Sequence, residues 1–392
     1  MNFDKLKNFM DYMAAERTPA NAAEVYLNGK TVFKYAAGFS DLERKKPLTG
    51  EEYFNIYSCS KITTVTAAIQ LLEQGKFLLA DPLGEYIPEY KTMYVKQADG
   101  TVKEAQKPIT IGDLFSMTAG LTYNFETDAF RKARKLTDGK MDTVAVVKCL
   151  AEDPLDFEPG TRWQYSLCHD VLAGLVSVVS GMKFRDYVRK NIFEPLEMTQ
   201  SFYHADEQIL NNMAEQYSYV PEGADANFDI VEAQKHGAVG GGTFVNVGKD
   251  VSHILGEEYD SGGAGIITTV ADYAKLAAAL ANYGEGLNGA RILSKYSVEL
   301  MRTNRLNEEQ HKSFDWKHLA GYGYGLGVRT HMDKAKSGSV SNVGEFGWGG
   351  AAGASVVVDP EINLAVFYVQ HCLNPREEGY QPRLKNVVYS CL

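Results

Sequence analysis

The chain of 392 residues has only five cysteines, and none of them forms a CxxC pair. An odd number of scattered cysteines argues against a disulfide framework and against a zinc site. No apolar run approaches the ~18 residues that would form a membrane-spanning helix. The N-terminal segment mixes charges into an amphipathic pattern and lacks the apolar core of a signal peptide. We therefore expect a cytoplasmic protein. An exported protein whose signal peptide had been removed would show the same sequence features.

Basic residues are also outnumbered, with 40 Lys and Arg against 50 Asp and Glu and a formal net charge of -10. This balance argues against nucleic acid and anionic membrane as partners. Three common motifs are missing as well: the P-loop GxxxxGK[ST], the zincin HExxH and the nucleophile elbow GxSxG. The sequence therefore gives no sign of a P-loop nucleotide-binding protein, a zincin peptidase or an α/β-hydrolase.

The apolar spacing that is present predicts strands at both ends of the chain and helices in the middle. Two short strands at 23–27 and 30–35 flank Asn28-Gly29, which is the strongest short hairpin signal. Helices are predicted at 4–15, 61–74, 111–118, 143–152, 166–180, 183–192, 271–283 and from 376 onward. Further strands are predicted at 323–330, 340–345, 351–358 and 363–370. This order favours an α+β fold, with one antiparallel sheet built from both termini and flanked by helices.

The same order predicts a single domain, 1–392, with two lobes. An α/β lobe would comprise approximately 1–58 and 261–392, and a mainly helical lobe approximately 59–203. Residues 204–260 are less regular but keep aromatic and apolar side chains, so we expect a lid or variable loop there rather than a linker.

The segment Ser58-Cys59-Ser60-Lys61 is the first candidate for chemistry. Three residues apart at a helix start, Ser58 and Lys61 share a face, so a desolvated amine could accept the serine proton. An ordinary helix-start serine beside an exposed lysine is the alternative interpretation. The chain has a second SxxK match, Ser180 to Lys183, but Gly181 would break the helix there.

Two further segments add candidates. A Pro-Gly turn precedes Tyr165, whose phenol could transfer protons beside a lysine. The run from Phe346 to Gly353 contains four glycines, which would let a ligand approach the backbone of an edge strand. The plain alternatives are a half-buried tyrosine and a glycine-rich hairpin with one packed tryptophan.

In this order and spacing the segments resemble the serine β-lactamase-like superfamily of class C β-lactamases, DD-peptidases and family VIII carboxylesterases. Supporting marks include Gly75 to Pro82, Ile109 to Phe115, Ser261 to Gly265 and Tyr322 to Gly325. The resemblance implies the serine β-lactamase/DD-peptidase-like fold. It also implies that Ser58 is the acyl-forming nucleophile, that Lys61 activates it and that Tyr165 relays the proton. The N–H groups of Ser58 and Ala351 would form the oxyanion hole.

The sequence departs from the penicillin-recognising pattern at two places. The family's Tyr-x-Asn triplet reads Tyr165-Ser166-Leu167, and its Lys-Thr-Gly triplet falls on Trp348-Gly349-Gly350. Both departures remove polar groups that would bind a β-lactam, and Trp348 instead suits an uncharged acyl or alcohol group. Leu167 is a candidate cleft residue. So is His169, one helical turn after Tyr165, with a packed or solvated histidine as the alternative.

The sequence therefore predicts a serine hydrolase without metal or cofactor, most simply a carboxylesterase acting on short-chain esters, with acyl transfer to alcohols as a variant. The alternatives are a β-lactamase, a DD-peptidase or a D-amino-acid peptidase, and a non-turnover binding or sensor homologue. A small-molecule ester or amide would be the partner. The oligomeric state is open at this stage.

Overall fold

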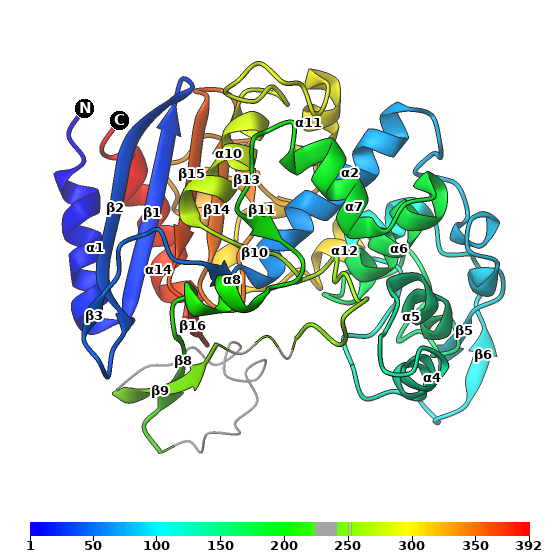
Figure 1. Cartoon of the computed structure of the whole chain (residues 1–392). Helices are drawn as coiled ribbons and strands as arrows, with labels where there is room; N and C mark the ends of the chain where they lie inside the picture. The colour runs from blue at the N-terminus through cyan, green and yellow to red at the C-terminus, as the bar shows by residue number, and fades with distance from the viewer. Residues whose placement is uncertain (224–240, 250, 252) are drawn as a thin grey trace.

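An eight-stranded antiparallel sheet carries the fold, in the order β11-β12-β13-β14-β15-β1-β2-β3. The computed structural model describes residues 1–223, 241–249, 251 and 253–392. In the centre of the sheet β1 (Ala20–Leu27) pairs with β15 (Leu364–Val369), so strands from the two ends of the chain lie side by side (Figure 1). The other strands are β2 (Lys30–Asp41), β3 (Lys46–Pro47), β11 (Tyr322–Tyr324), β12 (Arg329–His331), β13 (Phe346–Gly347) and β14 (Ser355–Asp359). The predicted α+β fold, with a sheet built from both termini, is confirmed.

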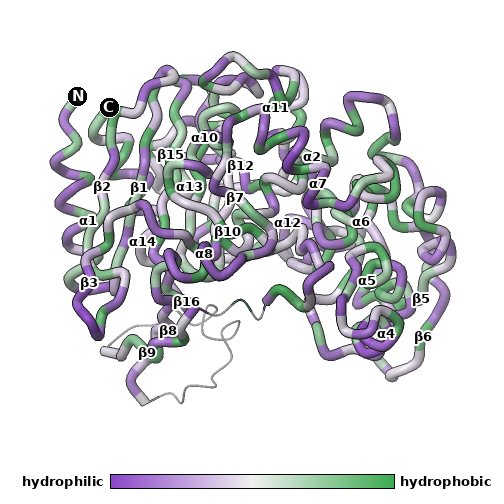
Figure 2. The backbone as a smooth tube through the Cα atoms, viewed as in Figure 1, coloured by the Kyte–Doolittle hydropathy of each residue, from purple (hydrophilic) through white to green (hydrophobic). Residues whose placement is uncertain are grey.

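Helices cover both faces of this sheet. On one face, α1 (Asp4–Glu16) and α14 (Glu377–Tyr389) share an apolar core with Val25 of β1 and Val366 of β15. On the other face, α10 (Val270–Ala281) packs on β1, β14 and β15. Successive strand residues point to opposite faces, so Tyr26 belongs to the second core. Hydrophobic residues gather along these inner strands in Figure 2.

The helical part of the molecule is built around α2 (Ser60–Glu73), which is buried along nearly its whole length. Helix α6 (Cys168–Ser180) packs against α2 and α5 (Thr143–Leu150). The remaining helices there are α3 (Ile111–Ser116), α4 (Asp128–Leu136) and α7 (Phe184–Val188). Because α2 leads from the sheet into these helices, its first turn lies where the two parts meet (Figure 1).

The Asn-Gly hairpin formed as expected. Asn28 and Gly29 have φ of 50° and 72°, the left-handed values that a type I′ turn requires. Strands β1 and β2 pair on either side of this turn.

Three predicted strands need correction. The stretch 323–330 is two short strands, because the backbone reverses between Gly325 and Val328 with a 2.8 Å hydrogen bond. No strand covers 340–345, where the Ser341 side chain bonds to His331 and a turn ends at Gly344. The strand predicted from 351 begins only at Ser355, since residues 350–353 form a turn closed by a bond from Gly353 N to Gly350 O.

The predicted lid region is more regular than expected in its described parts. It holds α8 (Glu207–Asn211), and its β8 (Gln216–Pro221) pairs with both β9 (Gly242–Gly248) and β16 (Cys372–Leu373). The rest of the predicted lid, 224–240, lies outside the described residues, and the lid and lobe boundaries stay predictions.

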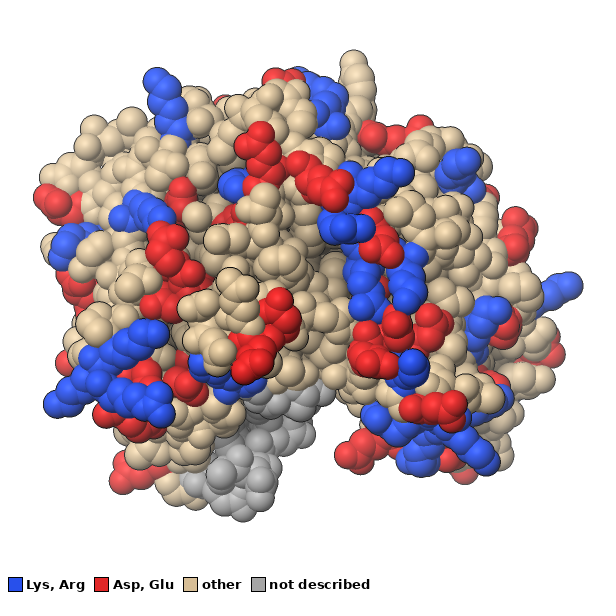
Figure 3. Space-filling view, in the orientation of Figure 1, with Lys and Arg blue, Asp and Glu red and all other residues tan. Residues whose placement is uncertain are grey.

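Charged side chains of both signs are interspersed over the face drawn in Figure 3. Within the described part of the chain, no helix has the length and hydropathy needed to cross a membrane.

Candidate active site

Ser58 lies on a short 3-10 turn, Tyr57–Cys59, that leads directly into α2. The preceding residue, Tyr57, has a φ of 44°. A non-glycine residue in this left-handed region costs on the order of 1–3 kcal/mol, and such strain concentrates at functional sites. Ser58 is largely buried in this turn, with 9% of the residue exposed.

Lys61 contacts Ser58 as the spacing predicted. Its Nζ lies 3.2 Å from Ser58 Oγ and 2.7 Å from the carbonyl oxygen of Gly263. The lysine is fully buried, and its Nζ lies 4.6 Å from the centre of the Tyr165 ring. Among the described residues no carboxylate oxygen comes within 4.0 Å of this nitrogen. The polar contacts of Lys61 Nζ among these residues are neutral oxygens, so no ion pair there draws the amine away from the Ser58 hydroxyl.

A buried carboxylate fixes the loop that supplies the Gly263 carbonyl. Asp170 on α6 is 2% exposed and accepts hydrogen bonds from Tyr259 (2.9 Å), Ser261 (2.7 Å) and the Gly263 N–H (3.3 Å). A Cβ atom added to Gly263 would lie 2.5 Å from Asp170 Oδ2 and 3.3 Å from Lys61 Nζ. Only glycine fits between the carboxylate and the amine.

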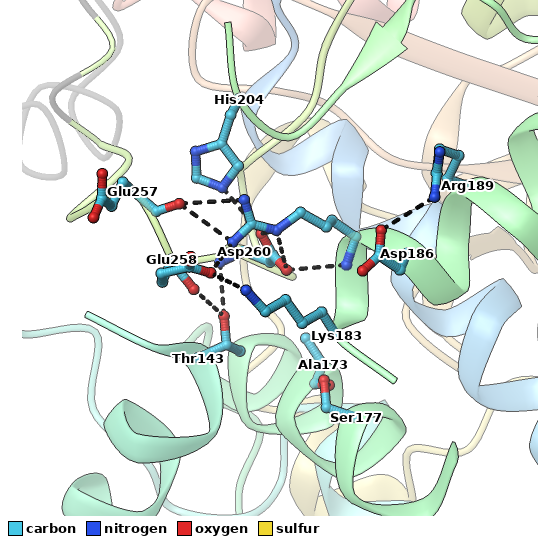
Figure 4. A network of polar contacts seen from close by, with 11 residues as sticks. Thr143, Ala173, Ser177, Lys183, Asp186, Arg189, His204, Glu257, Glu258 and Asp260 are labelled. Carbon is cyan, nitrogen blue, oxygen red and sulfur yellow. Dashed lines mark hydrogen bonds and ion pairs between the residues drawn. The ribbon is translucent and has the colours of Figure 1, made fainter. Parts of the chain in front are cut away.

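An ion network holds the same loop from outside (Figure 4). Asp260 is 2% exposed and accepts from Arg185 of α7 and from His204 Nε2 at 3.0 Å. Glu258 binds both Lys183 and Arg185 at 2.6 Å. The loop is therefore tied to α7 immediately before it reaches Ser261.

Tyr165 lies in a cluster of aromatic rings. It stacks between Tyr123, at 5.4 Å and 9°, and Trp348, at 5.7 Å and 23°. The chain's other two tryptophans, Trp163 and Trp316, lie 6.3 Å and 5.4 Å from the Tyr165 ring. All three tryptophans thus surround one tyrosine, which the spacing along the sequence could not reveal.

The hydroxyl of Tyr165 is bound by Trp348 of the glycine-rich segment and lies near the candidate nucleophile. Trp348 Nε1 donates to Tyr165 Oη at 3.3 Å, and Ser58 is close enough to lower the pKa of the phenol. Burial raises the pKa of Tyr165 well above its ordinary value, and the neighbouring Ser58 and Trp348 offset only part of that effect. The group is a neutral phenol at physiological pH.

The glycine-rich segment brings one backbone donor that no described residue engages, the Ala351 N–H, toward the turn that carries Ser58. A Cβ added to Gly350 would lie 2.2 Å from the carbonyl oxygen of Ile56, so the segment lies against the turn that carries Ser58. The N–H of Gly350 is used by Ala354 at 2.8 Å. By contrast, the N–H groups of Ser58 and Ala351 have no acceptor among the described residues. Two unpaired donors of this kind suit a developing oxyanion.

Two predicted cleft residues are instead packed in the core. His169 and Leu167 are 0% and 1% exposed. His169 Nε2 lies 3.3 Å from the carbonyl oxygen of Phe115, and burial lowers the pKa of His169 to about 3. His169 is therefore a packed histidine, which was the alternative to a cleft residue. Sequence reasoning missed Asp170, Tyr123 and Trp316, which had no spacing signal of their own.

Nothing among the described residues looks like a metal centre, since no three His, Cys, Asp or Glu side chains are grouped so as to hold an ion. Cys59, next to the candidate nucleophile, points its Sγ at the carbonyl oxygen of Trp348, 3.6 Å away, and is fully buried. Burial raises the pKa of this thiol, so it is not a reactive thiolate.

The chain is similar to proteins of known name along nearly its whole length. Protein Rv1367c of Mycobacterium tuberculosis (strain ATCC 25618 / H37Rv) is 29% identical over 86% of this chain and 81% of its own length. Esterase EstB of Burkholderia gladioli is 26% identical over 92% of this chain and 88% of its own. The solved structure of EstCE1, a hydrolase with promiscuous acyltransferase activity, superposes with a TM-score of 0.75 at 23% identity. That match covers 99% of this chain and 98% of EstCE1.

A family model described as Beta-lactamase matches residues 6–389. The match spans both the sheet and the helical part, and it includes every candidate residue described above. Named hydrolases occur among the relatives, which places the chain within a family of serine hydrolases. The chain belongs to the beta-lactamase family.

Proposed function

We propose that this protein is a carboxylesterase that hydrolyses short-chain esters through an acyl-enzyme intermediate on Ser58. The observation that carries the proposal is the 3.2 Å contact between Lys61 Nζ and Ser58 Oγ, beside two unpaired backbone N–H groups. A nucleophile, a proton acceptor and oxyanion donors directed at one point are the components that acyl transfer requires.

In the acylation step, Ser58 Oγ attacks the ester carbonyl carbon and its proton passes to Lys61. The carbonyl oxygen becomes the oxyanion and binds the N–H groups of Ser58 and Ala351. When the tetrahedral intermediate collapses, the bond to the alcohol oxygen breaks and Tyr165 gives that oxygen its phenolic proton. The proton on Lys61 then restores the phenol. The raised pKa of Tyr165 supports a role as proton donor, because the group is protonated at neutral pH.

In the deacylation step, a water molecule or a second alcohol attacks the acyl carbon. The same groups take its proton and return one to Ser58 Oγ, which leaves as the free hydroxyl. Water gives the carboxylic acid, and an alcohol gives a new ester. The indole rings of Trp316 and Trp348 would bind the apolar part of either acceptor.

The preference for esters over β-lactams rests on the glycine-rich segment 346–353. Where penicillin-recognising members have an ammonium and a hydroxyl, this chain has Trp348 and Gly349. A β-lactam carboxylate placed there would lose its hydration without gaining a partner. Trp348 is also committed to Tyr165 through its Nε1 hydrogen bond.

The test compares kcat/KM for p-nitrophenyl butyrate and for nitrocefin, using Ser58→Ala as the blank. We expect strong ester turnover and weak or no lactam turnover, with both lost in the variant. Lactam turnover equal to ester turnover would contradict the carboxylesterase assignment. Ester turnover that survives in Ser58→Ala would overturn the mechanism itself.

A further inference from the structure

Helix α14 brings a carboxylate against the glycine-rich segment 346–353. A Cβ atom added to Gly349 would lie 3.0 Å from Glu377 Oε1 and 2.5 Å from Gln381 Nε2. Because Gly349 has no side chain, these two polar groups lie directly beside its backbone. The Glu377 side chain is 13% exposed, so it is largely withdrawn from bulk water.

This carboxylate has polar neighbours but no cation in contact. Gln381 Nε2 donates to Glu377 Oε1 at 3.3 Å, and His318 Nε2 lies 3.7 Å from Oε2. Burial lowers the pKa of His318 to about 3, helped by the positive charges of Lys385 and Arg329, so the imidazole is neutral. No described lysine or arginine nitrogen lies within 4.0 Å of Glu377. A buried carboxylate in this state gains much from a cation that reaches it.

The carboxylate and the aromatic cluster lie at the same end of the site. Trp316 stacks on His318 at 5.9 Å and 29°, and on Trp348 at 5.8 Å and 36°. The negative charge of Glu377 also reaches Tyr165, whose pKa it helps to raise after the larger effect of burial. A carboxylate and indole faces attract positive charge by different mechanisms, and here they act on one region.

We propose that Glu377 is a specificity-determining residue that selects esters carrying a cationic group beside Gly349 and rejects esters carrying a carboxylate there. The proposal rests on the esterase function proposed above. It reverses the charge preference of the penicillin-recognising pattern, which has an ammonium on the same strand. The net charge of -10 acts in the same sense on approaching substrates.

The selection should depend on pH. Burial raises the pKa of Glu377 to about 7, with Arg329 opposing and Glu378 adding to the shift. Above pH 7 the carboxylate is ionised and attracts a cation, and below pH 7 it is neutral. The groups that face it or act on its charge are His318, Arg329, Glu378, Gln381, Tyr380, Tyr165 and Cys59.

Lys385 titrates in the same range and must be separated from Glu377. Burial lowers the pKa of Lys385 to about 7, so it gains a positive charge as the pH falls and would repel a cation. It lies on α14 and donates to Tyr322 Oη at 2.6 Å. A change of preference with pH is therefore assigned only by comparing variants at each of the two positions.

The test uses two series of esters, each with a cationic, a neutral and an anionic member of matched size. One series varies the alcohol: butyrylcholine, 3,3-dimethylbutyl butyrate and 3-(butyryloxy)propanoate. The other varies the acyl group of p-nitrophenyl esters: 4-(trimethylammonio)butanoate, 5,5-dimethylhexanoate and glutarate. We expect kcat/KM at pH 8.5 to favour the cationic over the neutral member on the order of tenfold in one series. The anionic member should be the poorest there, and the series that responds shows which part of the ester lies beside Gly349.

Glu377→Gln should bring the cation-to-neutral ratio of kcat/KM toward unity and remove the pH dependence of that ratio. In the neighbouring Glu378→Gln variant, the cation preference and its dependence on pH should both remain. Each ratio is measured in one enzyme sample, so a general loss of activity cancels. If Glu377→Gln does not fold, Lys385→Met decides what causes the pH dependence: the loss of the cation preference below pH 7 persists in this variant if Glu377 is responsible, and vanishes if Lys385 is. Equal rates in both series, or a ratio unchanged in Glu377→Gln, would overturn the proposal. Ser58-dependent turnover of the neutral esters would then leave the esterase function standing.

Discussion

The chemistry proposed for this protein depends on three side chains that meet at one point. Lys61 reaches the hydroxyl of Ser58, and Tyr165 lies beside both with its phenol protonated. The Ser58–Lys61 contact follows from helical spacing and was predictable. The position of Tyr165 in space was not, because it lies 107 positions further along the chain than Ser58 (165 − 58 = 107). The family resemblance supplied what spacing alone could not.

At the residue scale, Lys61→Met should remove most of the activity while keeping the packing of the stem. We expect kcat for p-nitrophenyl butyrate to fall on the order of 10²–10⁴-fold, the range typical of a lost general base. The control is Lys183→Met in the second SxxK match, which has no contact with Ser58 and binds Glu258 at the surface. Equal losses in the two variants would contradict the assignment.

Tyr165→Phe isolates the phenolic hydroxyl from the ring. The stacking on Tyr123 and Trp348 should survive, so the melting temperature should change little. The rate should nevertheless fall on the order of 10²-fold or more, because no group is left to protonate the alcohol. Steady-state kinetics and thermal denaturation on the same sample check both halves. A variant that keeps full activity would remove Tyr165 from the mechanism.

At the element scale, the loop 259–263 determines whether Lys61 points at Ser58. Position 263 of this loop requires glycine, because a methyl group there would lie 2.5 Å from Asp170 Oδ2. We expect Gly263→Ala to cost ~1–3 kcal/mol of stability and to lower kcat. A matched control is Gly379→Ala in α14, where nothing lies within 4 Å of the added carbon. That change should stabilise the protein by ~0.5–1 kcal/mol. Urea denaturation of both variants measures the change in the free energy of unfolding, which should be negative for Gly263→Ala and positive for Gly379→Ala. Changes of the same sign in both variants would contradict the account.

Local signals predicted the elements well where one residue type is required by geometry. Asn28 and Gly29 tolerate the left-handed turn that joins β1 and β2, as the Asn-Gly signal predicted. The predictions failed where side chains replaced the strand ladder, as at Ser341, or where a glycine turn interrupted an apolar run, as at 350–353. The gathering of three tryptophans around Tyr165 and the approach of Glu377 to Gly349 are tertiary contacts between distant segments, and no local pattern encodes them.

At the scale of the whole molecule, buried neutral histidines make stability depend on pH. Burial lowers the pKa of His169, His318 and His371 to about 3. In the unfolded chain they bind protons below ~6.5. Because the unfolded state then holds more protons, the free energy of unfolding should decrease as the pH falls from ~6.5 toward 3. Each histidine contributes up to ~1.4 kcal/mol per pH unit.

Urea denaturation at a series of pH values from 8 to 4 measures this slope. A single replacement, His169→Gln, should reduce the slope by the contribution of one proton while leaving the trend. A free energy of unfolding that stays constant from pH 8 to pH 4.5 would contradict the buried, neutral state of these histidines.

The central claim is that Ser58 carries the acyl group during turnover. The direct measurement is intact-protein mass spectrometry with peptide mapping, on enzyme quenched in acid during turnover of p-nitrophenyl butyrate. We predict one butyryl group, located on the peptide that contains Ser58, absent from Ser58→Ala and present in Ser180→Ala, the serine of the second SxxK match. A butyryl group on another residue, or full turnover in Ser58→Ala without any adduct, would contradict the account.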